Sequence, residues 1–201
     1  FSPDLKLVRQ WGVSGTNAGQ LAFPRAVAVN SRGEMFLSEY MFVERVQKFA
    51  LESVVSGQWS VAETIAGTNR QTTADYGPRT TDQEKLPSVK FIAGFGHAGQ
   101  GLGEFNRPEG LGIDAADRVY VADSCNHRIQ VFSSNGAFLR TYGQAGSGPG
   151  ELSYPYDVRV DKAGRQYVCE FGNSRVQVFD AADRSIEIIG GVGSTPGRMN
   201  N

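Results

Sequence analysis

The chain has 201 residues, of which 40% are hydrophobic and 10% aromatic, a composition typical of an ordinary globular protein. Twenty basic and 21 acidic residues leave a formal net charge of −1, so the chain lacks the long-range positive field that non-specific binders of nucleic acids or anionic membranes need. Two cysteines exclude a disulfide framework although they allow one bridge, and no apolar run reaches the roughly 18 residues of a membrane span.

Residues 5–49 form the first predicted unit, which opens with a strand over Leu5–Trp11. Phe23-Pro24 then leads into the apolar run 26–29, and a further run follows at 45–49. Short apolar runs bounded by turn residues indicate β-strands. The chain begins at Phe1 without a Met, so we expect that preceding residues were removed or left out.

Residues 50–89 interrupt this pattern. Trp59–Ala66 is predicted to be a strand, and residues 67–88 are rich in Thr, Gln, Asp and Pro, which indicates a mobile loop. The segment 64–67 resembles the end of a fourth strand, and Leu86-Pro87 resembles the entrance to a new unit. The segment is therefore an insertion or a degenerate unit, and a unit missing between Pro87 and Lys90 is a further alternative.

Residues 90–137 and 138–185 are two units that repeat without a gap. Gly96 and Gly143, Pro108 and Pro155, and Arg128 and Arg175 each differ by 47 positions. Each unit contributes four short strands joined by tight turns, which permit only antiparallel neighbours. In the second unit, these strands are expected at 110–114, 119–123, 128–132 and 138–142. Four-stranded antiparallel sheets repeated around an axis predict an all-β fold, the β-propeller.

The consensus of these units resembles a known family. A Gly-rich loop is followed by Pro-Glu-Gly-Leu-Gly-Ile-Asp at 108–114, Val-Tyr-Val-Ala-Asp at 119–123 and Asn-His-Arg-Ile-Gln-Val-Phe at 126–132. This pattern is similar to the NHL repeat, in its bacterial form. The resemblance implies a propeller scaffold and, by analogy with exported bacterial members, a periplasmic or extracellular location. It does not imply one function, because the same fold serves many.

Three units do not complete a ring. Propellers have four to eight blades, and an open array exposes sheet edges and apolar faces. Residues 186–201 begin a further unit, whose Pro would fall at position 202. We therefore expect three blades and one extra strand of a six-bladed or similar ring, with the remaining blades supplied by a longer parent chain or by self-association of two half-rings.

An acidic residue at the end of one strand and an arginine at the start of the next recur in every unit. Such pairs form charge-assisted hydrogen bonds across a hairpin, and their recurrence indicates a structural role. The pairs are Glu39 with Arg45, Asp123 with Arg128, and Glu170 with Arg175. The Gly-rich loops 96–103 and 143–150 open no helix, so they are interpreted as turns and not as phosphate-binding loops.

The two cysteines and two histidines predict no zinc site, because His97 and His127 lie in different loops without further ligands. Cys169 aligns with Ala122 within a strand and is expected to be a buried, inert thiol. Cys125 lies in a turn, where exposure is expected.

Residues that differ between the units gather in the loops that enter the first strand and join the second to the third. Aromatic residues and arginines in loops at one end of a rigid scaffold are typical of recognition sites, although core or rim packing would account for half of them. The candidates are Arg25, Tyr40, Met41, Phe42, Arg107, Glu109, His127, Tyr154, Tyr156 and Phe171.

The first functional hypothesis is a non-catalytic scaffold that binds a protein or a small ligand through this loop face and needs no cofactor. The alternative is a metal-dependent enzyme like the lactonases or lyases that resemble this family, with a divalent cation held by Glu, Asn or Asp in the central channel. Recognition of single-stranded RNA is the least expected function, because the net charge is close to neutral.

Overall fold

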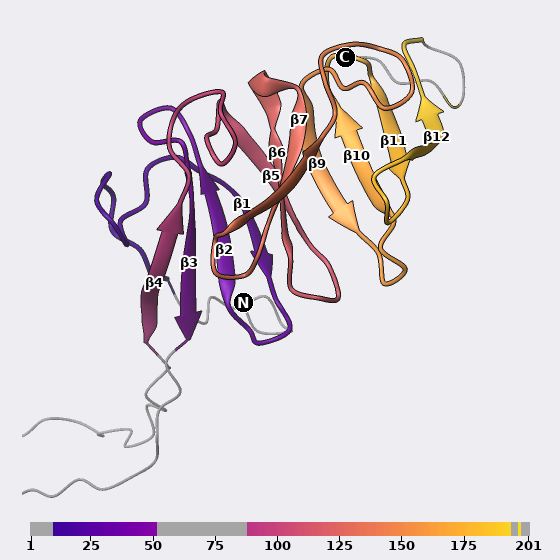
Figure 1. Cartoon of the computed structure of the whole chain (residues 1–201). Coiled ribbons are helices and arrows are strands. Elements are labelled where there is room, and N and C mark those ends of the chain that lie inside the picture. Colours follow the sequence, from indigo (N-terminus) through magenta and orange to yellow (C-terminus); the bar gives the residue numbers. More distant parts are fainter. Residues whose placement is uncertain (1–9, 52–87, 194–196, 198–201) are drawn as a thin grey trace, which may run out of the picture.

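The computed structural model describes residues 10–51, 88–193 and 197, and these residues form three four-stranded antiparallel sheets (Figure 1). The first sheet contains β1 (Pro24–Val29), β2 (Met35–Glu39), β3 (Arg45–Leu51) and β4 (Val89–Phe95). The second contains β5 (Pro108–Ile113), β6 (Val119–Asp123), β7 (Arg128–Phe132) and β8 (Phe138–Tyr142). The third contains β9 (Pro155–Val160), β10 (Gln166–Glu170), β11 (Arg175–Phe179) and β12 (Ser185–Gly190). The predicted all-β class is confirmed.

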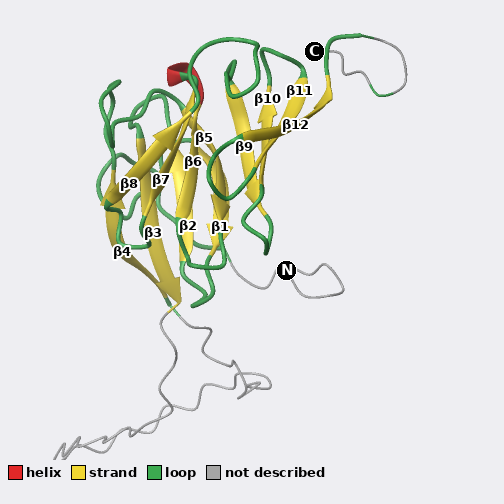
Figure 2. Cartoon of the chain, turned by 45° about the vertical axis from the view of Figure 1, so that its right-hand side comes forward, coloured by secondary structure: helices red, strands yellow, loops and turns green. Residues whose placement is uncertain are grey.

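The only helical element in the described part of the chain is the 3₁₀ turn η1 (Ser124–Asn126), which joins β6 to β7. Figure 2 shows the strands of each sheet running between two ends, with this turn at one of them. No helix among the described residues has the length and apolar character needed to cross a membrane. We call the end that carries η1 the loop end.

The strand pairing shows where each sheet begins and ends in the sequence. Leu51 at the end of β3 pairs with Val89 at the start of β4, so residues 52–87 connect two neighbouring strands of one sheet. The strand predicted at Trp59–Ala66 lies outside the described residues. Of the strand predicted at Leu5–Trp11, only Gln10 and Trp11 are described, and neither is in a strand.

The strand predicted at 186–189 pairs with β11 and is the fourth strand of the third sheet, as β8 is of the second. The second sheet thus crosses the boundary drawn at 137 from the sequence, and the third sheet crosses the boundary drawn at 185. A period fixes the length of a repeat but not its starting point, which the pairing of the backbone decides.

Neighbouring sheets pack face to face through apolar side chains. Phe36 and Val46 of the first sheet share a core with Leu111, Val119 and Phe132 of the second. A second core joins the second sheet to the third, and its members are Tyr120, Ala122, Ile129, Val131, Leu152, Val158, Val168 and Phe179. The sheets therefore stack as successive blades do, with the middle sheet covered on both faces.

Backbones approach closely between the second and third sheets. A Cβ atom added at Gly112 on β5 would lie 2.8 Å from the carbonyl oxygen of Val158 on β9, a separation that real Cβ atoms essentially never show. The absence of a side chain at Gly112 therefore sets the spacing of these two inner strands.

Exposure at equivalent positions shows which sheet faces lack a neighbour in the described structure. Leu111 and Val158 are fully buried, whereas Val27 at the same repeat position on β1 is 55% exposed. The prediction that an open array exposes apolar blade faces agrees with this difference.

The same reasoning corrects the prediction for Cys169. Ala122 is buried because the third sheet covers it, but Cys169 at the equivalent position is exposed, since no described sheet follows the third. Cys125 is half-buried, and burial raises the pKa of its thiol. Alignment within a repeat predicts which face of the sheet a side chain lies on, whereas the burial of that side chain depends on the neighbouring sheet.

Ion pairs and hydrogen bonds connect the first two sheets at the end opposite the loop end. Asp117, in the turn between β5 and β6, accepts hydrogen bonds from the backbone N–H and hydroxyl of Ser31, both at 2.8 Å, and from Arg32 at 3.0 Å. Within the first sheet, Lys48 lies 2.7 Å from Glu34. Burial raises the pKa of Glu34, but hydrogen bonds from Lys48, Asn30 and Arg32 outweigh that effect and bring the pKa to about 2.

We expect the Glu34 carboxylate to make stability fall in acid. Because its pKa is lower in the folded than in the unfolded chain, its contribution is present above pH 4.5 and is lost as the pH falls towards 2. Glu34→Gln is expected to remove about 1 kcal/mol of this acid dependence. Urea unfolding of both proteins at several pH values between 2 and 6 measures it, and parallel pH profiles would contradict the assignment.

Candidate binding site

Three buried carboxylates organise the loop end of the sheets. Asp123, at the end of β6, is fully buried and accepts hydrogen bonds from Arg128 Nε at 2.8 Å, Asn126 at 2.9 Å and Gln130 at 3.0 Å. It also accepts the backbone N–H of Asn106 at 2.7 Å. Burial raises the pKa of Asp123, and these hydrogen bonds partly offset that rise.

The other two predicted hairpin pairs have the same geometry. Arg45 Nε lies 2.7 Å from Glu39, and Arg175 Nε lies 2.6 Å from Glu170. Each arginine also donates to carbonyl groups of the preceding Gly-rich loop, as Arg175 does to Ser147 at 2.6 Å. These networks hold the loops against the sheets, which supports the structural interpretation of the pairs.

The backbone N–H groups of the two Gly-rich loops donate hydrogen bonds to glutamates of the chain itself. Glu151 Oε2 accepts the backbone N–H of Gly148 at 2.8 Å and of Ser147 at 3.0 Å, and Glu104 accepts that of Gly101 at 2.8 Å. These bonds lower the pKa of both carboxyl groups. Because a carboxylate of the chain already fills each amide cluster, the geometry agrees with turns and not with phosphate-binding loops.

Above these networks, one residue per sheet extends into the loop end from a left-handed backbone. Phe23, Arg107 and Tyr154 immediately precede the first-strand prolines and have φ values of 51°, 63° and 48°. Bulky residues rarely adopt positive φ, and such conformations are frequent at functional sites. In the second and third sheets, the carbonyl of this residue accepts the N–H of the next turn, from Ser124 and Phe171, both at 3.1 Å.

Two arginines share one buried carboxylate beside these residues. Arg25 Nε lies 2.7 Å from Glu109 Oε2, and Arg107 Nε lies 2.6 Å from Glu109 Oε1, while only 2% of the Glu109 side chain is exposed. Both guanidinium groups stack near the ring of Tyr40, with their central carbons 4.9 and 5.2 Å from its centre. The hydrogen bonds to Glu109 raise the pKa of both arginines. These contacts hold both side chains in place.

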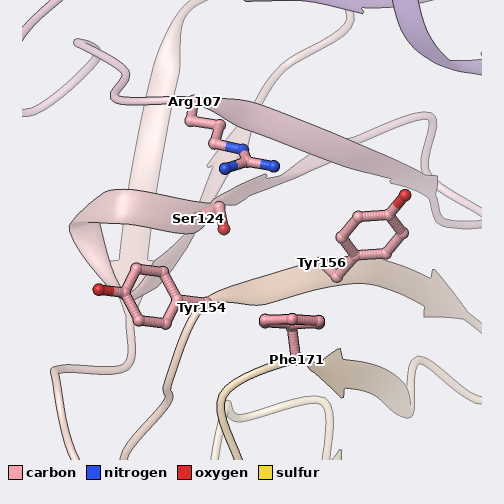
Figure 3. A pocket seen from close by; sticks show the side chains of 5 residues that line it. All are labelled: Arg107, Ser124, Tyr154, Tyr156 and Phe171. Atoms are coloured by element: carbon pink, nitrogen blue, oxygen red, sulfur yellow. The ribbon is translucent and has the colours of Figure 1, made fainter. Parts of the chain in front are cut away.

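A pocket of about 240 Å³ opens next to this cluster, between the second and third sheets. Its lining residues are Arg107, Ser124, Tyr154, Tyr156 and Phe171. Figure 3 shows the Arg107 guanidinium across the pocket from the Phe171 ring, with the two tyrosines on either side. Tyr154, Tyr156 and Phe171 are each at least 44% exposed, so the apolar surface is accessible.

The structure places the predicted candidates in three groups. Arg107, Tyr154, Tyr156 and Phe171 line this pocket, while Arg25, Tyr40 and Glu109 form the adjoining arginine cluster. His127 contacts the pocket residue Tyr154: its Nδ1 accepts the backbone N–H of Tyr154 at 3.2 Å, and the centres of the two rings lie 4.5 Å apart. The exposed Phe42 and Met41 belong to another part of the loop end, where Phe42 contacts Phe23.

Sequence reasoning missed Ser124 and Phe23. Ser124 occupies the repeat position held by Tyr40 and Phe171, and Phe23 occupies the position of Arg107 and Tyr154. Alignment of the three units by position would have found both. A small residue such as Ser124 leaves space for the pocket, whereas its equivalent in the third sheet, Phe171, supplies a wall.

A second pocket of about 470 Å³ lies along the inner strands β1, β5 and β9 and shares Tyr156 with the first. Its lining residues are Arg25, Ala26, Val27, Glu109, Gly110, Tyr156, Asp157, Arg159 and Cys169. Within it, Arg159 Nε lies 2.9 Å from Asp157. No three His, Cys, Asp or Glu side chains in the described residues lie close enough together to hold a metal ion.

Comparison with protein-family models matches residues 105–132 to the NHL repeat. This chain contains an NHL repeat. Protein lin-41 of Caenorhabditis elegans is 38% identical over 61 residues, which are 30% of this chain and 5% of that protein. Protein brain tumor of Drosophila melanogaster is 36% identical over 63 residues, or 31% of this chain and 6% of that protein. The NHL-repeat chain thus spans a small part of the curated relatives it matches.

Solved structures confirm the propeller fold. A catalytically inactive virginiamycin B lyase from Staphylococcus aureus, determined with quinupristin, has a TM-score of 0.52 and 12% identity over 92% of the NHL-repeat chain and 45% of the lyase. A gluconolactonase from Xanthomonas campestris has a TM-score of 0.51 and 15% identity over 94% and 53%, respectively. At these identities the similarity shows the fold alone. The NHL-repeat chain spans about half of each structure.

Proposed function

We propose that this NHL-repeat chain is a non-catalytic binding module that recognises a partner at the loop end through the pocket lined by Arg107, Tyr154, Tyr156 and Phe171. The observation that carries the proposal is the pocket itself: exposed aromatic side chains and an arginine surround a hollow on a rigid frame. Concave apolar sites with a few fixed polar groups are the usual form of binding sites, and Tyr and Arg dominate binding hot spots.

The rigidity of the frame supports the same proposal. The Arg107 side chain is held by Glu109, and the Tyr154 ring packs against the ring of His127. Side chains that are already ordered lose less entropy when a partner binds, so more of the contact energy appears as affinity. The left-handed backbone at Arg107 and Tyr154 is held by hydrogen bonds from the next turn to both carbonyl groups, so the points where these two side chains leave the backbone are fixed.

The enzyme alternative receives less support from the described residues. Glu109 and Asp157 are the carboxylates of the second pocket, and both are paired with arginines. A cation at Glu109 would have to compete with guanidinium groups that contact both carboxylate oxygens. At Asp157, one oxygen contacts Arg159 and the other has no hydrogen-bond partner in the described structure. We therefore retain the binding module as the proposed function.

The proposal is tested by selecting peptides from a random phage-displayed library on the immobilised chain. We expect binders whose affinity falls at least about 10-fold with Phe171→Ala, because truncation of a central aromatic contact typically costs more than 1 kcal/mol. Fluorescence anisotropy with synthetic copies of the selected peptides measures the change.

Leu139→Ala is the matched control. Leu139 is 47% exposed on the outer strand β8, away from the pocket, so its truncation should leave these affinities unchanged. Recovery of binders that are equally indifferent to Phe171→Ala and Leu139→Ala would refute the proposed site.

A further inference from the structure

The arginines around the two pockets are held in one particular way. Arg25 and Arg107 contact the two oxygens of Glu109 through Nε, and Arg159 contacts Asp157 through Nε. A guanidinium anchored through Nε keeps its terminal amino groups available, and these form the planar fork that matches a carboxylate. The buried Glu109 therefore orients two forks at the edge of one pocket.

The terminal amino groups are largely open to a ligand. Within the described structure, the side chain of Arg107 donates one hydrogen bond, from Nε, and 47% of this side chain is exposed. Arg25 adds a long contact of 3.3 Å from one terminal nitrogen to the hydroxyl of Tyr156. Stacking on Tyr40 limits the rotation of both groups. Directed donors without a strong acceptor thus lie beside an apolar hollow.

The local charge favours a single anionic group over a polyanion. Arg25 and Arg107 are offset by Glu109 and by Glu44, whose carboxylate accepts the backbone N–H of Arg107 at 2.8 Å. The whole chain has a net charge of −1. Nucleic acids are bound through an excess of positive charge along the phosphates, whereas one carboxylate needs only well-placed donors.

We propose that the site binds a peptide segment in which an Asp or Glu side chain lies next to a large apolar side chain. The carboxylate accepts hydrogen bonds from Arg107 and Arg25, and the apolar side chain enters the pocket lined by Tyr154, Tyr156 and Phe171. The volume of about 240 Å³ accommodates one large side chain. This inference rests on the proposed function, because it names the partner of the same pocket.

The test uses the peptides selected on the chain in the phage experiment. We expect Asp or Glu adjacent to an aromatic or large aliphatic residue to be enriched among the Phe171-dependent binders. Synthetic peptides in which that acid is changed to Asn or Gln should bind the chain at least about 10-fold more weakly, as expected for the loss of a charge-assisted pair.

Variants of the chain identify the donor. Arg107→Gln should abolish most of the preference for the acidic peptide, and Arg107→Lys should also reduce it, because lysine lacks the fork. Arg118→Gln is the matched control: Arg118 is likewise held through Nε, at 2.6 Å from Asp114, but lies in the turn between β5 and β6 at the opposite end. The Arg118→Gln variant should retain the full preference for the acidic peptide. Urea unfolding checks that each variant folds.

The outcomes separate this inference from the proposed function. If no Phe171-dependent peptide is recovered, the proposed function fails and the inference fails with it. If such peptides are recovered but bind equally well after the acid is neutralised, only the inference is overturned. Binding that requires a free C-terminal carboxylate, or Arg107-dependent binding of a ten-residue uridine RNA without any acidic-peptide preference, would overturn it as well.

Discussion

Replacing Arg128 with Ala is expected to lower the free energy of unfolding by about 3–5 kcal/mol, the usual result of removing one partner of a buried ion pair. The substitution leaves the Asp123 carboxylate fully buried beside Asn126 and Gln130, which are neutral donors. It also removes hydrogen bonds to the carbonyl groups of Gly101 and Glu104. Loss of this size is a large fraction of the stability of a typical domain.

Arg184→Ala provides the comparison for Arg128→Ala. Arg184 also pairs with an aspartate, Asp180 at 2.7 Å, but 79% of its side chain is exposed. Exposed pairs contribute about 0–1 kcal/mol, so urea unfolding should separate the two variants clearly. Equal losses would show that burial of Asp123 is not the source of the effect.

The loss of free energy of unfolding caused by Arg128→Ala should be smaller in acid. Burial already raises the pKa of Asp123, and removal of the guanidinium raises it further. In this variant, the folded chain takes up a proton at a pH where the unfolded chain does not, so protonation favours folding as the pH falls. Unfolding measured at pH 7 and pH 5 tests the sign.

The second large effect is expected for Gly96→Ala, at about 3 kcal/mol. Gly96 has φ +82°, where an L-residue costs about 1–2 kcal/mol. The added Cβ would also overlap the ring of Phe105, which is fully buried in the core between the first two sheets, and overpacking typically costs about 1–3 kcal/mol.

Gly33→Ala isolates the backbone contribution in this second experiment. Gly33 has a similar φ of +75°, but an added Cβ would meet nothing within 4 Å. Its loss should be about 1 kcal/mol, and the difference between the two variants then reports the clash with Phe105. If Gly33→Ala were as damaging as Gly96→Ala, strain alone would explain both.

The repeat explains why the fold could be predicted from the sequence. A period of 47 positions aligns Asp123 with Glu170 and Arg128 with Arg175. The two ion pairs that these residues form, Asp123 with Arg128 and Glu170 with Arg175, each lie within one hairpin. Contacts between residues five apart depend little on the rest of the chain. The strands and hairpin pairs therefore followed from local pattern.

Properties that depend on neighbouring sheets were harder to predict. Cys169 was expected to be buried like Ala122, but its exposure depends on the sheet beyond it. Phe42 was grouped with Phe171 because both lie in equivalent loops, yet Phe42 contacts Phe23 and not the pocket. Ser124 carries no signal by composition, because its contribution to the pocket is its small size.

The residue before each first-strand proline separates what the scaffold requires from what the surface presents. Its backbone carbonyl anchors the next turn in the second and third sheets, whereas its side chain extends into the loop end as arginine in one sheet and tyrosine in the other. The same backbone hydrogen bond forms with either side chain. Under the proposed function, a substitution at this single position alters the specificity of one blade while its neighbours and the framework stay the same, so a propeller of this kind gains new partners one blade at a time.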